Sequence, residues 1–367
     1  MPRKRVVVAM SGGVDSSLAA ALLKKDGYDV IGITMQVWPA ADTRYDNMPC
    51  CGLDAIDSAR NVASQLGIPH YVTNFRDIFA LTIIADFCDE YRRGRTPNPC
   101  IRCNQYIKFD ALLRKAQELD ADFIATGHYA QIRQAKAGYQ LLKAADREKD
   151  QTYFLYTLGQ QELKQILMPV GGLNKDKVRQ IAKEMALPSA SRQESQDICF
   201  IPDNDFRKFI AEHVPLIPGD IVDTKGKVLG KHSGLAQYTV GQRQGLGLAA
   251  RERLYILALD TANNRLVVGS REDVFRSRLT AGNLCWVSGL PPQGVTKVTA
   301  KIRSRAPEAQ ATLEVTGDTA IVTFSEPQWA ATPGQAVVFY QEDAVLGGGT
   351  IETSLPQNET TGRGNAC

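Results

Sequence analysis

Hydrophobic and polar positions follow two alternating patterns in the first third of the chain. Short apolar runs rich in β-branched residues lie at 6–10, 29–35, 70–73 and 123–126. Between and beside them, apolar positions recur at helical spacing over 15–25, 53–66, 78–93 and 103–119. Gly27 and Gly67 follow two of the helical segments, where glycine commonly ends a helix. Strands that alternate with helices predict an α/β fold with a parallel sheet covered on both faces.

The second half of the chain follows a different pattern. Residues 129–133 and 139–144 flank a Lys-Ala-Gly turn and predict a hairpin, and helical stretches then run to about residue 185. From residue 217 onward, turn signals separate short alternating runs at 253–259, 265–269, 297–302, 319–324 and 336–340. Short strands with regular turns predict a small β-rich domain followed by a β-barrel.

These changes of pattern set the expected domain boundaries. We expect the α/β domain at residues 1–204, the small central β-rich domain at 205–275 and the C-terminal β-barrel at 276–355. Residues 356–367 are polar and aperiodic, which predicts a disordered tail.

Composition narrows the class of protein. The chain has 367 residues, of which 44% are hydrophobic and 23% charged, and these values exclude a wholly disordered chain. No apolar run is long enough to span a membrane or to act as a signal peptide, so we expect a cytoplasmic protein. Because the net charge is only +3, any nucleic-acid surface must come from local clustering of basic residues. Eight cysteines are too few for a secreted disulfide scaffold and instead favour metal binding or thiol chemistry.

A glycine-rich loop joins the first strand to the first helix. Two adjacent glycines allow a tight turn and close approach to a ligand, and the helix that follows presents free N–H groups to an anion. Asp15 could hold Mg²⁺ on bound phosphates. Neither a Walker A motif nor G-x-G-x-x-G fits, but SGGVDSS resembles the S-G-G-x-D-S motif of the PP-loop ATP pyrophosphatases, which split ATP into AMP and pyrophosphate. The residues expected to bind ATP here are Ala9, Met10, Ser11, Gly12, Gly13, Val14, Asp15 and Ser16.

A basic segment at 92–109 carries two cysteines. It reads RRGRTPNPCIRCNQYIKF, with five basic residues and no acidic one. Its glycine and prolines predict a loop, so that Cys103 opens the next helix. Neighbouring cations and a helix N-terminus lower the pKa of a thiol, which predicts that Cys103 is a thiolate. The same charge would attract RNA phosphates.

The cysteines allow other interpretations. A structural zinc site needs four ligands, and only Cys50, Cys51 and Cys199 remain to join Cys100 and Cys103, so zinc is not favoured. A thioredoxin-like redox site remains open, although the proline-rich loop does not match that fold. Taken alone, Cys199 is typical of a buried core cysteine. Cys50 and Cys51 suggest a structural or incidental role.

Seven strings taken together resemble one family over residues 6–351. They are SGGVDSS, PNPCIRCNQYIKF, ATGHYA, DQTYFL, SQDICFI, TVGQRQGLGL and TPGQAVVFY, in this order. The combination is similar to MnmA, the tRNA-specific 2-thiouridylase family. The resemblance implies an adenine nucleotide alpha hydrolase-like PP-loop domain, a small central domain and a C-terminal tRNA-binding barrel. It also implies that ATP adenylates the 2-oxygen of the wobble uridine, at position 34, and that sulfur then replaces this oxygen.

The resemblance assigns roles to the cysteines. Cys199 matches the persulfide carrier, and Cys103 matches the nucleophile that releases the sulfur or forms a transient disulfide with Cys199. Many family members have Asp where this chain has Cys100. As a minority hypothesis, Cys100, Cys103 and Cys199 could ligate an iron–sulfur cluster, although four cysteines are the usual set.

Further positions are carried over by motif. Met35 and Gly127 end strands at the carboxyl edge of the sheet and match the adenosine site, while Asn98, Pro99 and Cys100 match the stretch beside the target base. Lys301, Arg303 and Arg305 alternate, which predicts a phosphate-binding stripe on one strand. The family usually has Tyr where this chain has Ser304. The positions expected to contact tRNA are His128, Lys149, Asp150, Gln151, Arg303, Ser304, Arg305 and Gln341.

The implied partners are tRNAs for Lys, Glu and Gln and a cysteine desulfurase or sulfur-relay protein, with ATP and Mg²⁺ and without a membrane. We expect a monomer. Two alternatives stand beside thiolation. A PP-loop ligase or amidotransferase acting on GMP or aspartate would not need Cys103 and Cys199. A non-enzymatic RNA-binding or metal-storage protein would not need a pyrophosphate loop.

Overall fold

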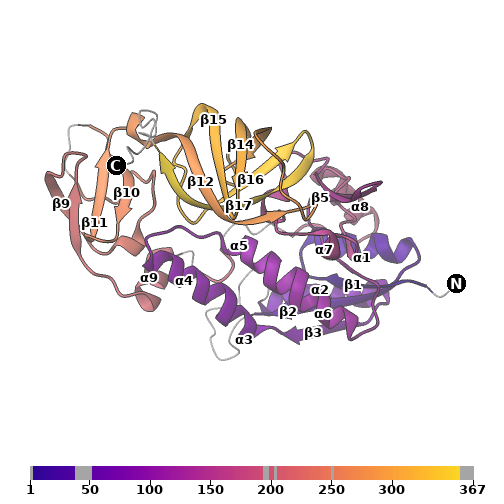
Figure 1. Cartoon of the computed structure of the whole chain (residues 1–367). Helices are drawn as coiled ribbons and strands as arrows, with labels where there is room; N and C mark the ends of the chain where they lie inside the picture. The colour runs from indigo at the N-terminus through magenta and orange to yellow at the C-terminus, as the bar shows by residue number, and fades with distance from the viewer. Residues whose placement is uncertain (1–2, 38–51, 193–197, 202–204, 249–251, 356–367) are drawn as a thin grey trace.

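A computed structural model describes residues 3–37, 52–192, 198–201, 205–248 and 252–355. Its strands form three sheets, and Figure 1 shows the first sheet and its helices beside a barrel, with a smaller β-rich part at the other end of the barrel. The predicted combination of a parallel-sheet α/β part, a small β-rich part and a C-terminal barrel is confirmed. Cys50 and Cys51 lie outside the described residues.

The first sheet is parallel and has five strands in the order β3-β2-β1-β4-β7. Val6, Val7 and Val8 of the central strand are fully buried, because helices cover both faces of the sheet. The fifth strand, β7, has two residues and falls within a stretch predicted to be helical, since a strand this short leaves no periodic signal. The strands are β1 (Arg5–Ala9), β2 (Asp29–Gln36), β3 (His70–Asn74), β4 (Phe123–Ala125) and β7 (Ile166–Leu167).

Helices flank this sheet. The predicted end of the second helix at Gly67 is confirmed, because Gly67 adopts the left-handed conformation that terminates helices. Two longer helical stretches each contain a π-helical segment, η2 and η3. The helices of this part are α1 (Val14–Lys25), α2 (Leu53–Leu66), α3 (Arg76–Phe79), η2 (Ala80–Ile84), α4 (Ala85–Arg92), α5 (Pro99–Arg102), η3 (Cys103–Ala111), α6 (Leu112–Gln117), η4 (Thr152–Phe154), α7 (Gln160–Leu163) and α8 (Lys175–Glu184).

The helix that carries the two cysteines begins earlier than the sequence predicted. Asn98 is its N-cap and Pro99 its first residue, so Cys103 lies in the second turn and does not open the helix. Proline suits a first helical position because its fixed φ fits and its missing N–H is not needed there. The helix N-terminus therefore acts on Cys100 more directly than on Cys103.

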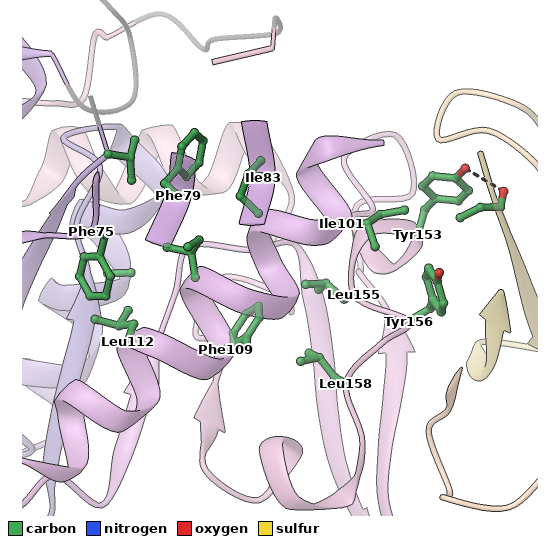
Figure 2. Packing of buried hydrophobic residues seen from close by; sticks show 14 of the residues in the cluster. Phe75, Phe79, Ile83, Ile101, Phe109, Leu112, Tyr153, Leu155, Tyr156 and Leu158 are labelled. Carbon is green, nitrogen blue, oxygen red and sulfur yellow. Dashed lines mark hydrogen bonds between the residues drawn. The ribbon is translucent and has the colours of Figure 1, made fainter. Parts of the chain in front are cut away.

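The predicted hairpin is confirmed as β5 (Ala130–Ala135) and β6 (Gly138–Lys143). It does not stay with the parallel sheet. Leu142 of β6 pairs with Ala344 of the last barrel strand, so the hairpin extends the barrel sheet. A cluster of buried side chains continues across this junction. Figure 2 shows Tyr153 at its barrel side, where the phenol donates to the carbonyl of Ala336 at 2.9 Å.

The central part consists of a short helix followed along the chain by a four-stranded sheet. Its order is β10-β11-β8-β9, in which β11 and β8 run parallel. Ile221, Ile256 and Leu266 are fully buried in its own core. The elements are α9 (Phe206–His213), β8 (Gly219–Val222), β9 (Val228–His232), η6 (Leu235–Gln237), β10 (Tyr255–Asp260), β11 (Arg265–Gly269) and η7 (Glu272–Val274).

Six strands form the barrel in the order β12-β15-β14-β13-β16-β17, and β12 closes it by pairing with β17. Closure leaves the strands of the barrel without an open edge, and alternate residues fill its interior. The strands are β12 (Phe275–Trp286), β13 (Thr296–Lys301), β14 (Ala309–Thr316), β15 (Thr319–Trp329), β16 (Ala336–Gln341) and β17 (Ala344–Leu355).

The predicted placement of Lys301, Arg303 and Arg305 on one strand is wrong. The strand β13 ends at Lys301, and Arg303 lies in the bend that follows. Nη2 of Arg303 donates to the carbonyls of Val240 and Ala330 and to Oγ1 of Thr332. Burial lowers the pKa of this guanidinium. Arg303 therefore joins the barrel to the central part, whereas Arg305 is exposed.

No helix in the described part of the chain is both long and apolar enough to cross a membrane.

Replacing Arg303 tests its structural role. Arg303→Ala removes charge-assisted hydrogen bonds, and we expect a loss of about 2 kcal/mol of stability. That loss corresponds to a fall in Tm of about 4–8 °C, measured by differential scanning calorimetry. Lys297→Ala, which changes the charge equally at an exposed position on β13, serves as the control and should leave Tm within about 1 °C. Equal Tm values for the two variants would contradict this role.

Candidate functional site

A cavity of about 420 Å³ lies where the carboxyl ends of β1, β2 and β4 face the cysteine-bearing helix. This is the edge at which open α/β sheets bind ligands. The predicted site residues that line the cavity are Ala9, Met10, Ser11, Asp15, Ser16, Met35, Pro99, Cys100, Cys103, Gly127, His128, Gln151 and Cys199. Those that do not line it are Gly12, Gly13, Val14, Asn98, Lys149, Asp150, Arg303, Ser304, Arg305 and Gln341.

The glycine-rich loop forms one wall of the cavity. Gly12 has φ +73°, and a Cβ at this position would lie 2.3 Å from the carbonyl oxygen of Ala55 on α2. A side chain is therefore excluded where the loop turns. Ser16 Oγ donates to the carbonyl of Gly13 at 3.1 Å and accepts from the amide of Ser11 at 3.2 Å. These bonds hold the loop in the shape of an anion cradle at the start of α1.

Asp15 has a partner that the sequence did not indicate. Its carboxylate accepts from the Lys175 ammonium at 2.8 Å through both oxygens and from the Tyr129 hydroxyl at 2.7 Å. Lys175 is the first residue of α8, and only 9% of its side chain is exposed. A lysine in a first helical turn is typical of a solvated helix end, so sequence alone gave no signal. The pair places a cation directly behind the loop.

Gly127 lets the end of β4 touch the loop. A Cβ there would lie 2.6 Å from the carbonyl carbon of Asp15 and from the amide nitrogen of Ser16. Backbone atoms cannot move aside as a flexible side chain can. Met35, at the end of β2, lines the same wall and is partly buried. The two positions expected at the adenosine thus both lie on the cavity.

The three cysteines of interest open on this one cavity. Cys103 and Cys199 are half-buried and pack against the main core, while Cys100 is exposed. The fold thus brings together two thiols that are 96 residues apart in the sequence. No group of three His, Cys, Asp or Glu side chains among the described residues is arranged to hold a metal ion. The geometry therefore gives no support to an iron–sulfur cluster on Cys100, Cys103 and Cys199.

His128 faces the cavity and is not on the outer surface. Its Nδ1 lies 2.8 Å from Oγ1 of Thr126, and its Nε2 lies 3.4 Å from the Lys108 ammonium. Burial first, and the Lys108 charge second, hold the pKa of His128 well below its usual range. The imidazole is therefore neutral near pH 7, so a contact with a tRNA phosphate would gain no charge attraction from it. The ammonium of Lys108 supplies the positive charge at this wall.

The turn at 149–151 is mostly engaged inside the protein. Asp150 accepts from the amide of Ala144 at 2.9 Å and from the hydroxyl of Thr152 at 2.6 Å, and burial raises the pKa of its carboxyl. Gln151 accepts from the amide of Tyr129 and lines the cavity. Gln341 is exposed at the end of β16. Of these predicted tRNA contacts, Gln341 is placed on the surface and Gln151 in the cavity.

Asn104 is a further cavity residue that the sequence analysis missed. Its amide donates to the carbonyl of Phe154 at 3.1 Å, and its own carbonyl oxygen has no hydrogen-bond partner in the structure as described. The side chain is almost wholly buried. A buried polar atom of this kind costs free energy unless a ligand or water satisfies it. Asparagine after a cysteine carries no sequence signal of its own.

The loop, the sheet edge and the cavity define a nucleotide-binding α/β enzyme of the PP-loop type with thiol groups in its site. Family models agree with this class over three consecutive segments. Residues 4–203 match the tRNA methyl transferase HUP domain, 207–270 the tRNA methyl transferase PRC-barrel domain and 276–351 the aminomethyltransferase beta-barrel domain.

Relatives identify the family within this class. The tRNA-specific 2-thiouridylase MnmA of Acetivibrio thermocellus is 50% identical over 359 residues, which cover 96% of this chain and 100% of that protein. Its counterpart in Geotalea uraniireducens is 51% identical and covers 96% of each chain. The chain belongs to the MnmA family of tRNA-specific 2-thiouridylases.

A solved complex of a 4-thiouridine synthetase with RNA and bound ATP is 19% identical to this chain. That match has a TM-score of 0.36 and covers 58% of this chain and 50% of the other.

Gly127→Ala tests the contact between β4 and the loop. The added Cβ would displace the backbone of Asp15 and Ser16, and we expect the affinity for ATP to fall by about tenfold or more. Isothermal titration calorimetry measures this loss. Gly172→Ala is the matched control, because a Cβ there meets no atom within 4 Å. Unchanged ATP affinity in the Gly127 variant would contradict the assignment.

Proposed function

We propose that this protein is an ATP-dependent tRNA uridine 2-sulfurtransferase that thiolates the wobble uridine at position 34. One observation carries the proposal. A phosphate-binding loop and two thiols that lie 96 residues apart open on the same cavity, in a chain half identical to tRNA-specific 2-thiouridylases over its length. Activation of an oxygen by ATP and its replacement by sulfur need these two groups side by side.

The residues present fit ATP with Mg²⁺. Main-chain N–H groups at the start of α1, together with the hydroxyls of Ser11 and Ser16, form a cradle for pyrophosphate. The Lys108 ammonium adds positive charge at the cavity lining, and the Lys175 ammonium, paired with Asp15, lies behind the loop. Asp15 is the carboxylate beside the loop, and it would hold Mg²⁺ by exchanging the metal for the Lys175 ammonium, which contacts both of its oxygens in the structure. The metal would neutralise charge on the phosphates. Met35 and Gly127 form the adenosine side.

The first chemical step is adenylation. The uridine 2-oxygen attacks the α-phosphorus of ATP, the bond to the β-phosphate oxygen breaks, and pyrophosphate leaves. The 2-oxygen then departs later as part of AMP. The loop residues Ser11 and Ser16 orient the pyrophosphate, and the cations around it stabilise the charge that develops on the leaving group.

The second step transfers sulfur. The outer sulfur of a Cys199 persulfide attacks C2 of the uridine, and AMP leaves. The Cys103 thiolate then attacks the inner sulfur of Cys199, which forms a Cys103–Cys199 disulfide and leaves 2-thiouridine. A dithiol reductant restores both thiols, and a cysteine desulfurase or relay protein reloads Cys199. These proposed reaction steps do not use an iron–sulfur cluster.

The tRNA partner would bind across the cavity mouth and the barrel. Asn98, Pro99 and Cys100 lie at the start of the cysteine helix, beside the target base in this proposal. Gln341, Arg305 and Lys149 would contact the tRNA backbone, a mode of recognition that reads shape. The proposed substrates are the tRNAs for Lys, Glu and Gln, and the proposed working form is a cytoplasmic monomer.

Asp15→Asn tests the adenylation step. Loss of the carboxylate charge should reduce tRNA-dependent pyrophosphate release by about 100-fold, because the Mg²⁺ site loses its ligand. Binding of tRNA, measured by filter retention, should stay unchanged. Asp26→Asn removes the same charge at an exposed position just after α1 and is the control. Pyrophosphate release at the wild-type rate from the Asp15 variant would refute the assignment.

Cys199→Ser tests the persulfide carrier. The protein is incubated with ATP, Mg²⁺, unmodified tRNA, cysteine and a cysteine desulfurase, and the digested nucleosides are analysed by mass spectrometry. We expect no 2-thiouridine from this variant, while pyrophosphate release continues. Cys285→Ser, a half-buried thiol that does not line the cavity, should retain the wild-type yield. A normal yield from Cys199→Ser would sink the carrier assignment.

A further inference from the structure

The segment that leads into the cysteine helix is held from outside the α/β part. Residues 95–98 lie between α4, which ends at Arg92, and the helix that carries Cys100 and Cys103. The last of them, Asn98, is the N-cap of that helix. Its side chains and its backbone bond to the barrel and to the central part. The segment is thus a short link between the barrel and the thiols.

Arg95 provides the first of these contacts. Its Nε donates to Oε2 of Glu90 on α4 at 2.7 Å, and its Nη2 donates to Oε1 of Glu352 on β17 at 3.2 Å. Nη1 of Arg95 also bonds to Glu352. The Arg95 side chain is 19% exposed and that of Glu90 13%. A planar guanidinium can bridge two carboxylates in this way, which a lysine ammonium cannot reproduce.

The barrel turn before β16 provides the second set of contacts, and these involve backbone. The amide of Thr96 donates to the carbonyl of Pro333 at 2.8 Å. The side-chain amide of Gln335 donates to the carbonyls of Thr96 at 2.9 Å and Pro97 at 3.2 Å. Gly334, at φ +90°, lies so close that a Cβ there would be 2.8 Å from the Thr96 nitrogen.

The turn is itself fixed to the strand that carries Glu352. The amide of Gly334 donates to the carbonyl of Ile351, and the amide of Ile351 donates to the carbonyl of Gln335. Glu352 follows directly on β17. Side-chain and backbone contacts to the segment therefore come from one rigid corner of the barrel. The hydroxyl of Thr96 adds a contact to Thr239 of the central part at 3.2 Å.

We propose that Arg95 is a positioning residue for the thiol chemistry. By bridging Glu90 to Glu352, and with the turn at 333–335 beside it, Arg95 fixes the segment from which the cysteine helix starts. The barrel thereby sets the place of Cys100 and Cys103 in the cavity. The kinetic part of this inference rests on the proposed function, whereas its geometric part does not.

Alkylation of individual thiols tests the geometric part. Trypsin cuts after Arg102 and so separates Cys100, in TPNPCIR, from Cys103, in CNQYIK. Iodoacetamide labelling of the folded full-length protein, followed by peptide mass spectrometry, gives a rate for each thiol. In Arg95→Lys and Glu352→Gln we expect the half-buried Cys103 to react about threefold faster or more, because its helix start is no longer fixed. Gly334→Ala, which changes no charge, should act in the same direction.

Glu308→Gln is the matched control. Glu308 pairs with Lys143 across the junction of β6 and the barrel and is 27% exposed, but it does not touch residues 95–98. This variant should keep the wild-type alkylation rate, and any fall in its Tm measures the loss of an ion pair that lies away from the segment. The proposal would be overturned if Cys103 reacted at the same rate in the Arg95, Glu352 and Glu308 variants. This applies if all three rates match the wild type, and also if all three rates rise together with a common fall in Tm.

Kinetics separate positioning from general destabilisation. For Arg95→Lys we expect kcat for thiolation to fall by about tenfold. The KM for ATP should stay within about twofold, because the bridge from Glu90 through Arg95 to Glu352 does not touch the glycine-rich loop. An unchanged kcat would overturn the positioning role. If the wild-type protein forms no thiouridine at all, the proposed function fails, and the alkylation rates alone decide the role of Arg95.

Discussion

Close approach of three backbone segments at the end of β1 is the constraint on which the site depends. The loop turns against α2 at Gly12 and against the end of β4 at Gly127, with no room for a Cβ at either position. These contacts fix where α1 starts and therefore where its free N–H groups point. They also place Asp15 against Lys175, which arrives from α8 far along the chain. An anion cradle without these contacts would be a flexible turn, and flexible donors stabilise a leaving group poorly because they must first be ordered.

The charge in the cavity depends on which side chains are buried there as well as on the net charge of the chain. The net charge of the chain is only +3, yet among the described residues the cavity is lined by the Lys108 ammonium and the Asp15 carboxylate, and Lys175 lies directly behind its loop. His128 adds no charge, because burial and Lys108 lower its pKa. A polyanion and thiolates are both favoured in such surroundings. The Tyr129 hydroxyl donates a further hydrogen bond to the Asp15 carboxylate, which also pairs with Lys175.

Local pattern predicted the elements of this fold well, and it failed where residues far apart in sequence meet. Four parallel strands, the hairpin and the barrel strands at 297–301, 319–329 and 336–341 followed from periodicity, whereas the barrel strands at 275–286, 309–316 and 344–355 were not predicted. The SGGVDSS string indicated the loop that lines the cavity. The helix start at Pro99 was missed because a proline-rich stretch is typical of a loop, although proline also favours the first helical turn. Arg303 was taken for a surface cation because alternation continues past the end of β13 in sequence but not in the chain path. Lys175 and Asn104 gave no local signal, since their roles come only from packing.

The barrel is joined to the lining of the cavity by hydrogen bonds at two places. In the turn Thr152–Phe154, Tyr153 bonds to the barrel carbonyl of Ala336 while the next residue, Phe154, lines the cavity. Gln335, the barrel residue next to Ala336, bonds to the backbone just before the cysteine helix. One corner of the barrel therefore contacts two neighbouring parts of the cavity lining, which are also joined directly because the Asn104 amide on the cysteine helix donates to the carbonyl of Phe154. A ligand that shifts this corner would move the thiols and the turn at 152–154 together, because a close-packed junction transmits displacement instead of absorbing it.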